Sequence, residues 1–185
     1  MTEFKLKPLE EKELDLVLRW GNAPQIREHM FTDHQITKEE HYAWFAKNKL
    51  NNDQLALLFV YKNQPLGFVH FSQLDRKNGT CSWGFYIGEQ NRPPKSGTAM
   101  GYLALTHLFD TYGMSKLYAE VLDSNVISLR YHHKMGFREE GRLRKQWKKR
   151  GRLVDVIVMA LNKEQWAVRR KQLSEELSRT FGTRF

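Results

Sequence analysis

Residues 91–105 read NRPPKSGTAMGYLAL, in which two prolines, a lysine and a serine stand directly before small and apolar residues with helical spacing. The start of a helix has unpaired backbone N–H groups and the positive end of the helix dipole, so it can bind an anion such as pyrophosphate. The residues predicted to hold this anion are Lys95, Ser96, Gly97, Thr98 and Ala99. The alternative is an ordinary capped helix with a stiff entry.

A carboxylate stands in the middle of the next predicted strand, residues 116–122. The two-residue period of a strand puts Leu117, Ala119 and Val121 on one face and Glu120 on the other. A carboxylate buried in a strand needs a partner or has a raised pKa, which suits a general base that takes a proton from an ammonium group. Glu120 is therefore a candidate general base, and an ion pair with an arginine is the structural alternative.

Three polar residues share one face of the helix predicted within residues 124–136. Ser128 follows Asn125 by three positions and His132 follows it by seven, so their side chains project in one direction. We expect this face to border the same site as the anion-binding loop. Asn125 is also a good N-cap, which could by itself explain that residue.

The elements that position these residues follow from the hydrophobic period. The segments predicted as strands are 4–6, two within 55–74, 80–88, 116–122, 137–147 and 153–161. The segments predicted as helices are 10–22, 39–50, 96–112, 124–136 and one that starts after Asn162. Two helix starts are marked by capping boxes, at Thr37 with Glu40 and at Asn162 with Gln165. A hairpin turn is predicted at Asn78-Gly79. We predict one α/β domain over residues 1–185, with a mixed, mostly antiparallel sheet and helices on both faces.

The composition limits the partners. A formal net charge of +9 suits an anionic partner, but the chain lacks the long basic run with interleaved aromatic residues that would favour nucleic acid. No apolar run approaches ~20 residues and the N-terminus does not resemble a signal peptide, so we expect a cytoplasmic protein that does not enter a membrane. The single cysteine, Cys81, is predicted to pack in a strand, and the histidines show no arrangement that predicts a metal site.

The order of strand, loop, helix, strand, Asn-Val-Ile-Ser, helix and Gly-Phe resembles the GNAT acetyltransferase superfamily over nearly the whole chain. Arg92 and Gly97 match the outer positions of the coenzyme loop of that family, whereas Lys95 stands where its first glycine usually does. The resemblance implies acetyl-CoA as co-substrate, with its pyrophosphate on the loop. It also implies further contacts with the coenzyme by Phe85, Tyr86, Ile87, Asn125 and Ser128.

In the family, a tyrosine four residues before the glycine of Gly-Phe is proposed to protonate the coenzyme thiolate. His132 occupies that place here, while Tyr131 is one position off and points elsewhere. An imidazole with a pKa near ~6.5 can give a proton to a thiolate whose acid has a pKa of ~8.5. We predict His132 as general acid and Glu120 as general base, with a hydrogen-bonding wall as the alternative role of His132.

Within residues 18–45, Asn-x-Pro, Met-Phe and EEHYAWF resemble the UDP-4-amino-4,6-dideoxy-N-acetyl-beta-L-altrosamine N-acetyltransferases of pseudaminic acid biosynthesis, which serve flagellin glycosylation. The resemblance implies a UDP-linked amino sugar as acceptor. Its expected contacts are Met30, Phe31, His41 and Trp44, each of which could instead be packing core. Those enzymes commonly have an arginine where this chain has Gly21. The alternatives are acetylation of protein N-termini, such as those of ribosomal proteins, and a non-catalytic acyl-CoA-binding or RNA-binding module.

Overall fold

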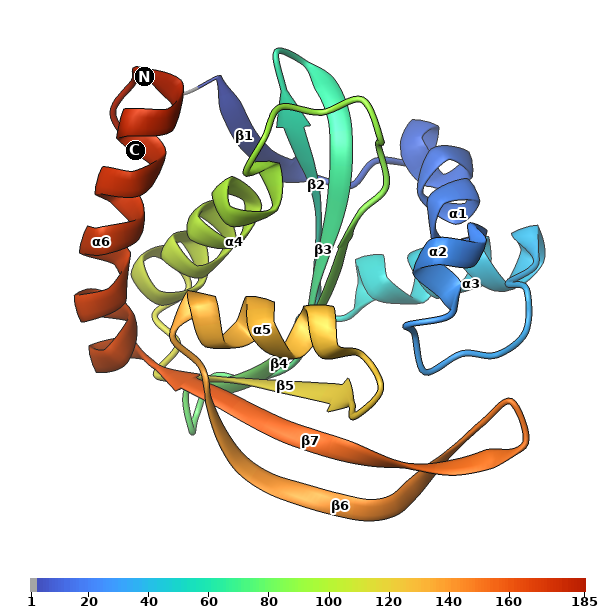
Figure 1. Cartoon of the computed structure of the whole chain (residues 1–185). Helices are drawn as coiled ribbons and strands as arrows, with labels where there is room; N and C mark the ends of the chain where they lie inside the picture. The colour runs from blue at the N-terminus through green and yellow to red at the C-terminus, as the bar shows by residue number, and fades with distance from the viewer. Residues whose placement is uncertain (1–2) are drawn as a thin grey trace.

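The computed structural model describes residues 3–185 and contains one seven-stranded sheet with the strand order β1-β2-β3-β4-β5-β7-β6 (Figure 1). The strands are β1 (Phe4–Pro8), β2 (Leu55–Tyr61), β3 (Gln64–Asp75), β4 (Thr80–Ile87), β5 (Lys116–Leu122), β6 (Arg138–Lys149) and β7 (Arg152–Asn162). Neighbouring strands are antiparallel except β4 and β5, which are parallel. The predicted mixed, mostly antiparallel sheet is therefore confirmed.

Helices lie on both faces of this sheet. They are α1 (Leu14–Asn22), α2 (Pro24–Arg27), α3 (Lys38–Leu50), α4 (Ser96–Thr106), α5 (Val126–Met135) and α6 (Lys163–Phe181), with short 3-10 and π turns at Glu11–Glu13 and His107–Thr111. Successive residues of β2 and β3 enter different cores: Leu58 and Phe68 pack with the residues of α1 and α3, whereas Phe59 and Val69 pack with those of α4 and α6. The period of two thus builds two separate apolar layers.

The local signals in the sequence act where they were predicted. Both capping boxes form, with Thr37 accepting from the Glu40 N–H and Asn162 accepting from the Gln165 N–H. The turn before β4 contains Gly79 at a φ of 69°. In the same turn, the Asp75 carboxylate accepts the N–H groups of Lys77 and Asn78. These contacts define the ends of the elements, and the apolar period defines their faces.

Cys81 is buried in the core, and burial raises the pKa of its thiol to about 12, in agreement with its predicted packing role. Across residues 3–185, no helix has the combination of length and apolar composition that crossing a membrane requires.

Candidate active site

Strands β4 and β5 separate in the middle of the sheet. Their ladder consists of three pairs, Thr80 with Lys116, Cys81 with Leu117 and Ser82 with Tyr118, although β4 continues to Ile87 and β5 to Leu122. Beyond the third pair, each strand presents main-chain polar groups to the gap and not to the other strand. Such an edge can pair with an extended ligand by adding it as a strand. The predicted pantetheine contacts Phe85, Tyr86 and Ile87 all lie on this part of β4.

Alternation along β4 sends its side chains to different places. Phe85 packs against the rings of Tyr131 and His132 of α5, at centroid distances of 4.9 and 5.5 Å. Tyr86 points to the other face, where its hydroxyl donates to the Val17 carbonyl at 3.0 Å. The pantetheine contact predicted for Phe85 and Tyr86 therefore involves their main chain, because their side chains pack on opposite faces of the sheet.

Helix α4 begins after the loop that follows β4, at the position where the sequence predicts an anion-binding site. Lys95 is the N-cap in a left-handed conformation, with φ 61° and ψ 13°, which is the conformation that the glycine of the family loop adopts easily. The Ser96 hydroxyl donates to the Pro93 carbonyl at 2.6 Å, and the Thr98 and Ala99 side chains are buried. The Ser96 N–H donates to the Pro93 carbonyl at 3.3 Å and the Ala99 N–H to the Lys95 carbonyl at 3.0 Å, so the backbone N–H groups left for a ligand in this turn are those of Gly97 and Thr98. A Cβ at Gly97 would have the Tyr131 ring as its nearest neighbour, at 3.9 Å, so this turn is open.

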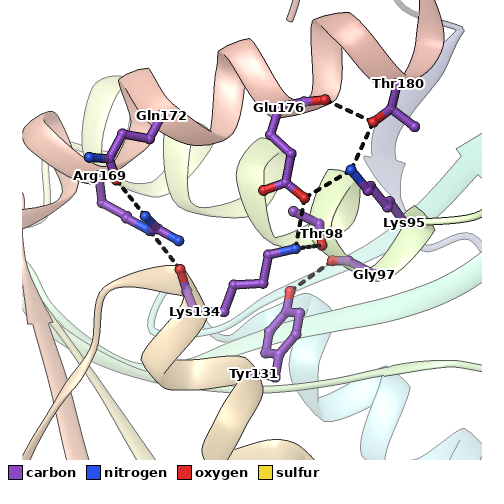
Figure 2. A network of polar contacts seen from close by, with 9 residues as sticks. All are labelled: Lys95, Gly97, Thr98, Tyr131, Lys134, Arg169, Gln172, Glu176 and Thr180. Atoms are coloured by element: carbon purple, nitrogen blue, oxygen red, sulfur yellow. Dashed lines mark hydrogen bonds and ion pairs between the residues drawn. The ribbon is translucent and has the colours of Figure 1, made fainter.

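The two cations predicted for the pyrophosphate point to protein partners in this structure. The Lys95 ammonium donates to Thr180 at 3.0 Å and pairs with Glu176 at 3.1 Å, both in α6 (Figure 2). The exposed Arg92 guanidinium donates to the Glu89 carbonyl at 2.7 Å. The charged side chains of the loop are thus held by protein partners, and the binding of an anion by its main chain stays a prediction.

Asn125, Ser128 and His132 lie together on one face of α5, as their spacing predicted. The Asn125 side chain caps the helix by accepting from the Ser128 N–H at 3.1 Å. The His132 Nδ1 atom lies 2.8 Å from the Ser128 carbonyl, to which it donates. Asn125 and Ser128 are thus explained by the helix itself, and their contacts with a coenzyme stay a prediction.

The expected pKa of His132 near 6.5 is wrong for its environment. The side chain is 3% exposed and is enclosed by the rings of Trp83, Phe85 and Phe137. Burial lowers the pKa of His132 to about 4, and its Nε2 atom has no hydrogen-bond partner among the described residues. At neutral pH the imidazole is therefore uncharged, and its one N–H proton, on Nδ1, is donated to the Ser128 carbonyl. This geometry favours the alternative role, in which Nε2 is an acceptor in the wall of the site.

Tyr131 is a residue whose part in the site the sequence did not reveal. Its hydroxyl donates to the Gly97 carbonyl at 2.8 Å, and burial raises its pKa (Figure 2). The phenol reaches α4 because Gly101 has no side chain, since a Cβ there would lie 2.2 Å from the Tyr131 hydroxyl oxygen. Gly101, in the middle of a predicted helix, was the signal for this close approach.

Glu120 is exposed, which corrects the prediction that it is buried. The apolar cluster under α1 and α3 takes its strand residues from β2, β3 and β4 and does not extend to β5, so it does not cover Glu120. Its strand neighbour is Val158 of β7, and Glu120 makes no ion pair with residues 3–185, which removes the arginine alternative. Leu117, Ala119 and Val121 belong to the other core, so Glu120 lies on the Tyr86 side of the sheet.

A pocket of about 360 Å³ lies on this same side, between α1, α3 and the segment that joins them. Its lining residues are Val17, Leu18, Gly21, Met30, Thr32, His34, Ile36, Glu40, His41, Trp44, Phe68, His70 and Tyr86. Three of the four predicted acceptor contacts are among them. Gly21 makes the pocket deeper, because a Cβ at this position would lie 3.5 Å from the Tyr86 hydroxyl.

The polar side chains in the pocket include three histidines, Thr32, Glu40 and Tyr86. His34 lies 3.2 Å from the Glu40 carboxylate, and the buried His41 stacks on Trp44 at 5.4 Å. Burial lowers the pKa of His41, and its Nε2 atom has no partner among the described residues. Most of the remaining lining is apolar or aromatic, which is typical of a site for a small molecule with a few orienting groups. Beside this pocket, a recess of about 640 Å³ is lined by Asp15, Leu18, Arg19, Asn22, Ala23, Gln35 and Lys38.

Phe31 does not line the pocket, contrary to the prediction. Its ring packs edge-to-face on Trp147 of β6 at 5.1 Å, and the Trp147 indole N–H donates to the Phe31 carbonyl at 2.9 Å. Phe31, which was predicted to contact the acceptor, thus joins the segment between α2 and α3 to the β6–β7 hairpin.

The same hairpin provides Lys149, whose part the sequence did not reveal. This ammonium is buried and donates to the carbonyls of Arg27, Met30 and Thr32, and it pairs with Asp33 at 2.9 Å. The Asp33 carboxylate also accepts the Arg150 N–H at 3.0 Å. Met30 and Thr32 line the pocket, so Lys149 fixes one of its walls. The basic turn was visible in the sequence, but its partner more than a hundred residues away was not.

Comparison with known proteins agrees with this arrangement. Residues 3–138 match the family described as Acetyltransferase (GNAT) domain, so the chain belongs to that family. It is an N-acetyltransferase of the GNAT type that uses acetyl-CoA. The gap between β4 and β5 and the open first turn of α4 fit this coenzyme, whose thioester supplies the acetyl group.

Among its relatives, the chain is 23% identical over 180 residues to a spermidine N(1)-acetyltransferase of Escherichia coli strain K12, which covers 94% of this chain and 93% of that one. It is 21% identical over 169 residues to the N-acetyltransferase p20 of Bacillus licheniformis, covering 88% and 94%. A crystal structure of spermidine N-acetyltransferase from Vibrio cholerae with CoA and spermine has a TM-score of 0.83 at 19% identity, covering 89% of this chain and 98% of that one. These relatives support the predicted family and fold, but they do not support the amino-sugar member of the family.

Proposed function

We propose that the chain transfers the acetyl group of acetyl-CoA to the primary amine of a small molecule held in the 360 Å³ pocket. The observation that carries this proposal is that the pocket and the β4–β5 gap share strand β4. Tyr86 forms part of the pocket, and the unpaired main chain of the same strand borders the gap. An amine in the pocket and a thioester in the gap would therefore meet across one strand, as direct attack requires.

The residues of the chain then have separate tasks. Main-chain N–H groups of β4 that face the gap can hydrogen-bond to the thioester oxygen and stabilise the negative charge that develops there. Glu120 is exposed on the pocket side of the sheet, so it can take the proton of the ammonium directly or through water. The backbone N–H groups of the first turn of α4 would hold the pyrophosphate.

For the acceptor, we propose the amino group of a UDP-4-amino-4,6-dideoxy sugar. Met30, Ile36 and Phe68 give the pocket an apolar wall suited to a deoxygenated sugar. The neighbouring recess contains Arg19 and Lys38, whose charges can attract a diphosphate, although Lys38 pairs with Asp15 at 3.1 Å. The net charge of +9 also favours an anionic substrate.

A polyamine is the second candidate, because the relatives with named substrates are spermidine acetyltransferases. A polycation is best recognised by several carboxylates. In this pocket Glu40 is the one carboxylate among the lining residues, and it is already close to His34. The chemistry of the pocket therefore favours the amino sugar over the polyamine.

Mass spectrometry can test the proposal by incubating the protein and acetyl-CoA with one amine per reaction: the UDP-4-amino-4,6-dideoxy sugar, spermidine, or an N-terminal peptide of a ribosomal protein. We expect the acetylated sugar. Acetylated spermidine alone would replace the sugar by the second candidate, and an acetylated peptide alone would contradict the small-molecule pocket. No product from any of the three would leave the acceptor proposal without support.

A variant that fills the pocket locates the reaction. Gly21→Leu should abolish transfer to the sugar while coenzyme binding stays unchanged, because the new side chain would enter the pocket beside Tyr86. Gly141→Leu is the control, since Gly141 has open space at its Cβ position and lies in the distant strand β6. Full activity of Gly21→Leu would place the acceptor elsewhere.

A further inference from the structure

Helix α6 lies outside the residues that match the family and runs beside α4 (Figure 1). Three apolar residues of the helix are buried in the core, Trp166, Leu173 and Leu177. Arg169 donates from Nε to the Lys134 carbonyl at 2.7 Å, which joins α6 to the end of α5. The position of α6 relative to α4 and α5 is thus fixed by packing and by hydrogen bonding.

One carboxylate oxygen of α6 binds two lysines near the start of α4 (Figure 2). Glu176 Oε1 lies 3.1 Å from the Lys95 ammonium and 3.0 Å from the Lys134 ammonium. Burial alone would raise the pKa of Glu176, but the hydrogen bonds from Lys134 and Lys95 outweigh it and lower the pKa. Glu176 is therefore an anion on which two cations from different helices converge.

Each lysine has a second partner that does not depend on Glu176. Lys95 donates to the Thr180 hydroxyl at 3.0 Å, and Lys134 donates to the Thr98 hydroxyl in the first turn of α4 at 3.1 Å. The side chains of Lys95 and Lys134 are 40% and 36% exposed, so an anion from solvent can reach them. Without Glu176, both ammonium groups would stay near the start of α4.

We infer that Glu176 is an internal counter-anion which a phosphate of the coenzyme displaces from Lys95 and Lys134. The inference rests on the proposed position of the pyrophosphate at the start of α4. A phosphate group has more acceptor oxygens than a carboxylate and carries at least as much charge, so it can replace Glu176 as the shared partner of both lysines. The C-terminal helix would thus reduce the affinity of the enzyme for its co-substrate.

A purely structural role for Glu176 predicts the opposite result. If the carboxylate served only to hold the lysines in a productive position, its removal would weaken coenzyme binding. If it competes with the phosphate, its removal tightens binding, because the ammonium groups no longer have to exchange one anion for another. The sign of the change therefore separates the two roles.

Isothermal titration of the full-length protein with coenzyme A measures this sign. We expect Glu176→Gln to lower Kd by ~3- to 10-fold, in keeping with the small energy of a partly exposed ion pair. Glu175→Gln is the matched control, since it removes the same charge from the neighbouring, exposed position. It should leave Kd nearly unchanged. Titration with dephospho-coenzyme A shows which phosphate is involved: an equal gain indicates the pyrophosphate, and a gain confined to coenzyme A indicates the 3′-phosphate.

Lys134→Met distinguishes a failure of this inference from a failure of the proposed coenzyme position. Weaker binding in Lys134→Met supports the contact of this lysine with a phosphate. An unchanged or raised Kd in Glu176→Gln would then overturn the counter-anion role alone. An unchanged Kd in Lys134→Met would overturn the contact itself, and with it the proposed position of the phosphates near this cluster.

Discussion

At the scale of single residues, two glycines of α4 have different reasons to be glycine. Gly101 makes room for Tyr131 and Met135, and a Cβ there would lie 2.2 and 2.8 Å from their side-chain atoms. Gly97 has no such neighbour and instead leaves the first turn open to a ligand. The first is a packing requirement of the fold, and the second belongs to the proposed coenzyme site.

Gly101→Ala should therefore lower the free energy of unfolding by ~1–3 kcal/mol, as overpacking does, and should weaken coenzyme binding by moving Tyr131 away from Gly97. Gly97→Ala should weaken coenzyme binding while the protein stays as stable as the wild type. Urea denaturation and coenzyme titration of both variants measure the two effects. Equal stabilities of the two variants would contradict the packing role of Gly101.

The buried imidazole of His132 predicts a loss of stability in acid. Its pKa is about 4 in the folded protein, against ~6.5 for an unfolded chain, so between these values the unfolded state binds more protons. The contribution of this residue to the free energy of unfolding is complete above pH ~6.5 and is lost as the pH falls toward 4. At 1.36 kcal/mol per pKa unit, it is on the order of 3 kcal/mol.

His132→Phe should flatten the decrease in unfolding free energy between pH 6.5 and 4, measured by urea denaturation at a series of pH values. The exposed neighbour His133→Phe is the control and should keep the wild-type slope. His70, whose pKa burial also lowers to about 4, accounts for part of the slope that remains. A wild-type slope in His132→Phe would show that this imidazole is accessible to protons in the folded protein.

At the scale of elements, the β6–β7 hairpin supports the acceptor pocket from a distance. The Lys149 ammonium donates to three carbonyls of the segment between α1 and α3, and the Trp147 indole N–H donates to a fourth, that of Phe31. Removing the ammonium would take this donor from the first three carbonyls and leave Asp33 with the Arg150 N–H as its donor. The segment that carries Met30 and Thr32 would then lose its fixed conformation.

Lys149→Met should thus reduce kcat/KM for the amine by about tenfold, which corresponds to ~1.4 kcal/mol, while Kd for coenzyme A stays unchanged. Steady-state kinetics at saturating acetyl-CoA and calorimetric titration measure the two quantities. Lys148→Met, at the exposed neighbouring position, should have wild-type kinetics. A parallel loss of coenzyme affinity in Lys149→Met would indicate a general loss of structure and not a local effect on the pocket.

At the scale of the whole molecule, the sequence predicted the elements better than the contacts between distant elements. Caps such as Thr37 with Glu40 and the apolar run of residues 55–60 are local, so the elements they define could be recognised directly. Alternation also showed that Glu120 lies opposite Ala119, but it could not show that the Glu120 side chain is exposed. The contacts of Lys95 with α6 and of Lys149 with residues 27–33 join segments far apart in the chain, and no local pattern reveals them.

The net charge of the whole molecule gives a test of the acceptor class. At +9, the protein attracts an anionic acceptor and repels a polycation, and added salt screens both effects because the Debye length falls to ~10 Å at 0.1 M ionic strength. At saturating acetyl-CoA, kcat/KM for the UDP-amino sugar should fall as salt is added. For spermidine, any activity should rise or stay constant under the same conditions. A rate for the sugar that does not respond to salt would mean that its diphosphate is not drawn in by the positive surface. The recess with Arg19 and Lys38 would then have no part in binding it.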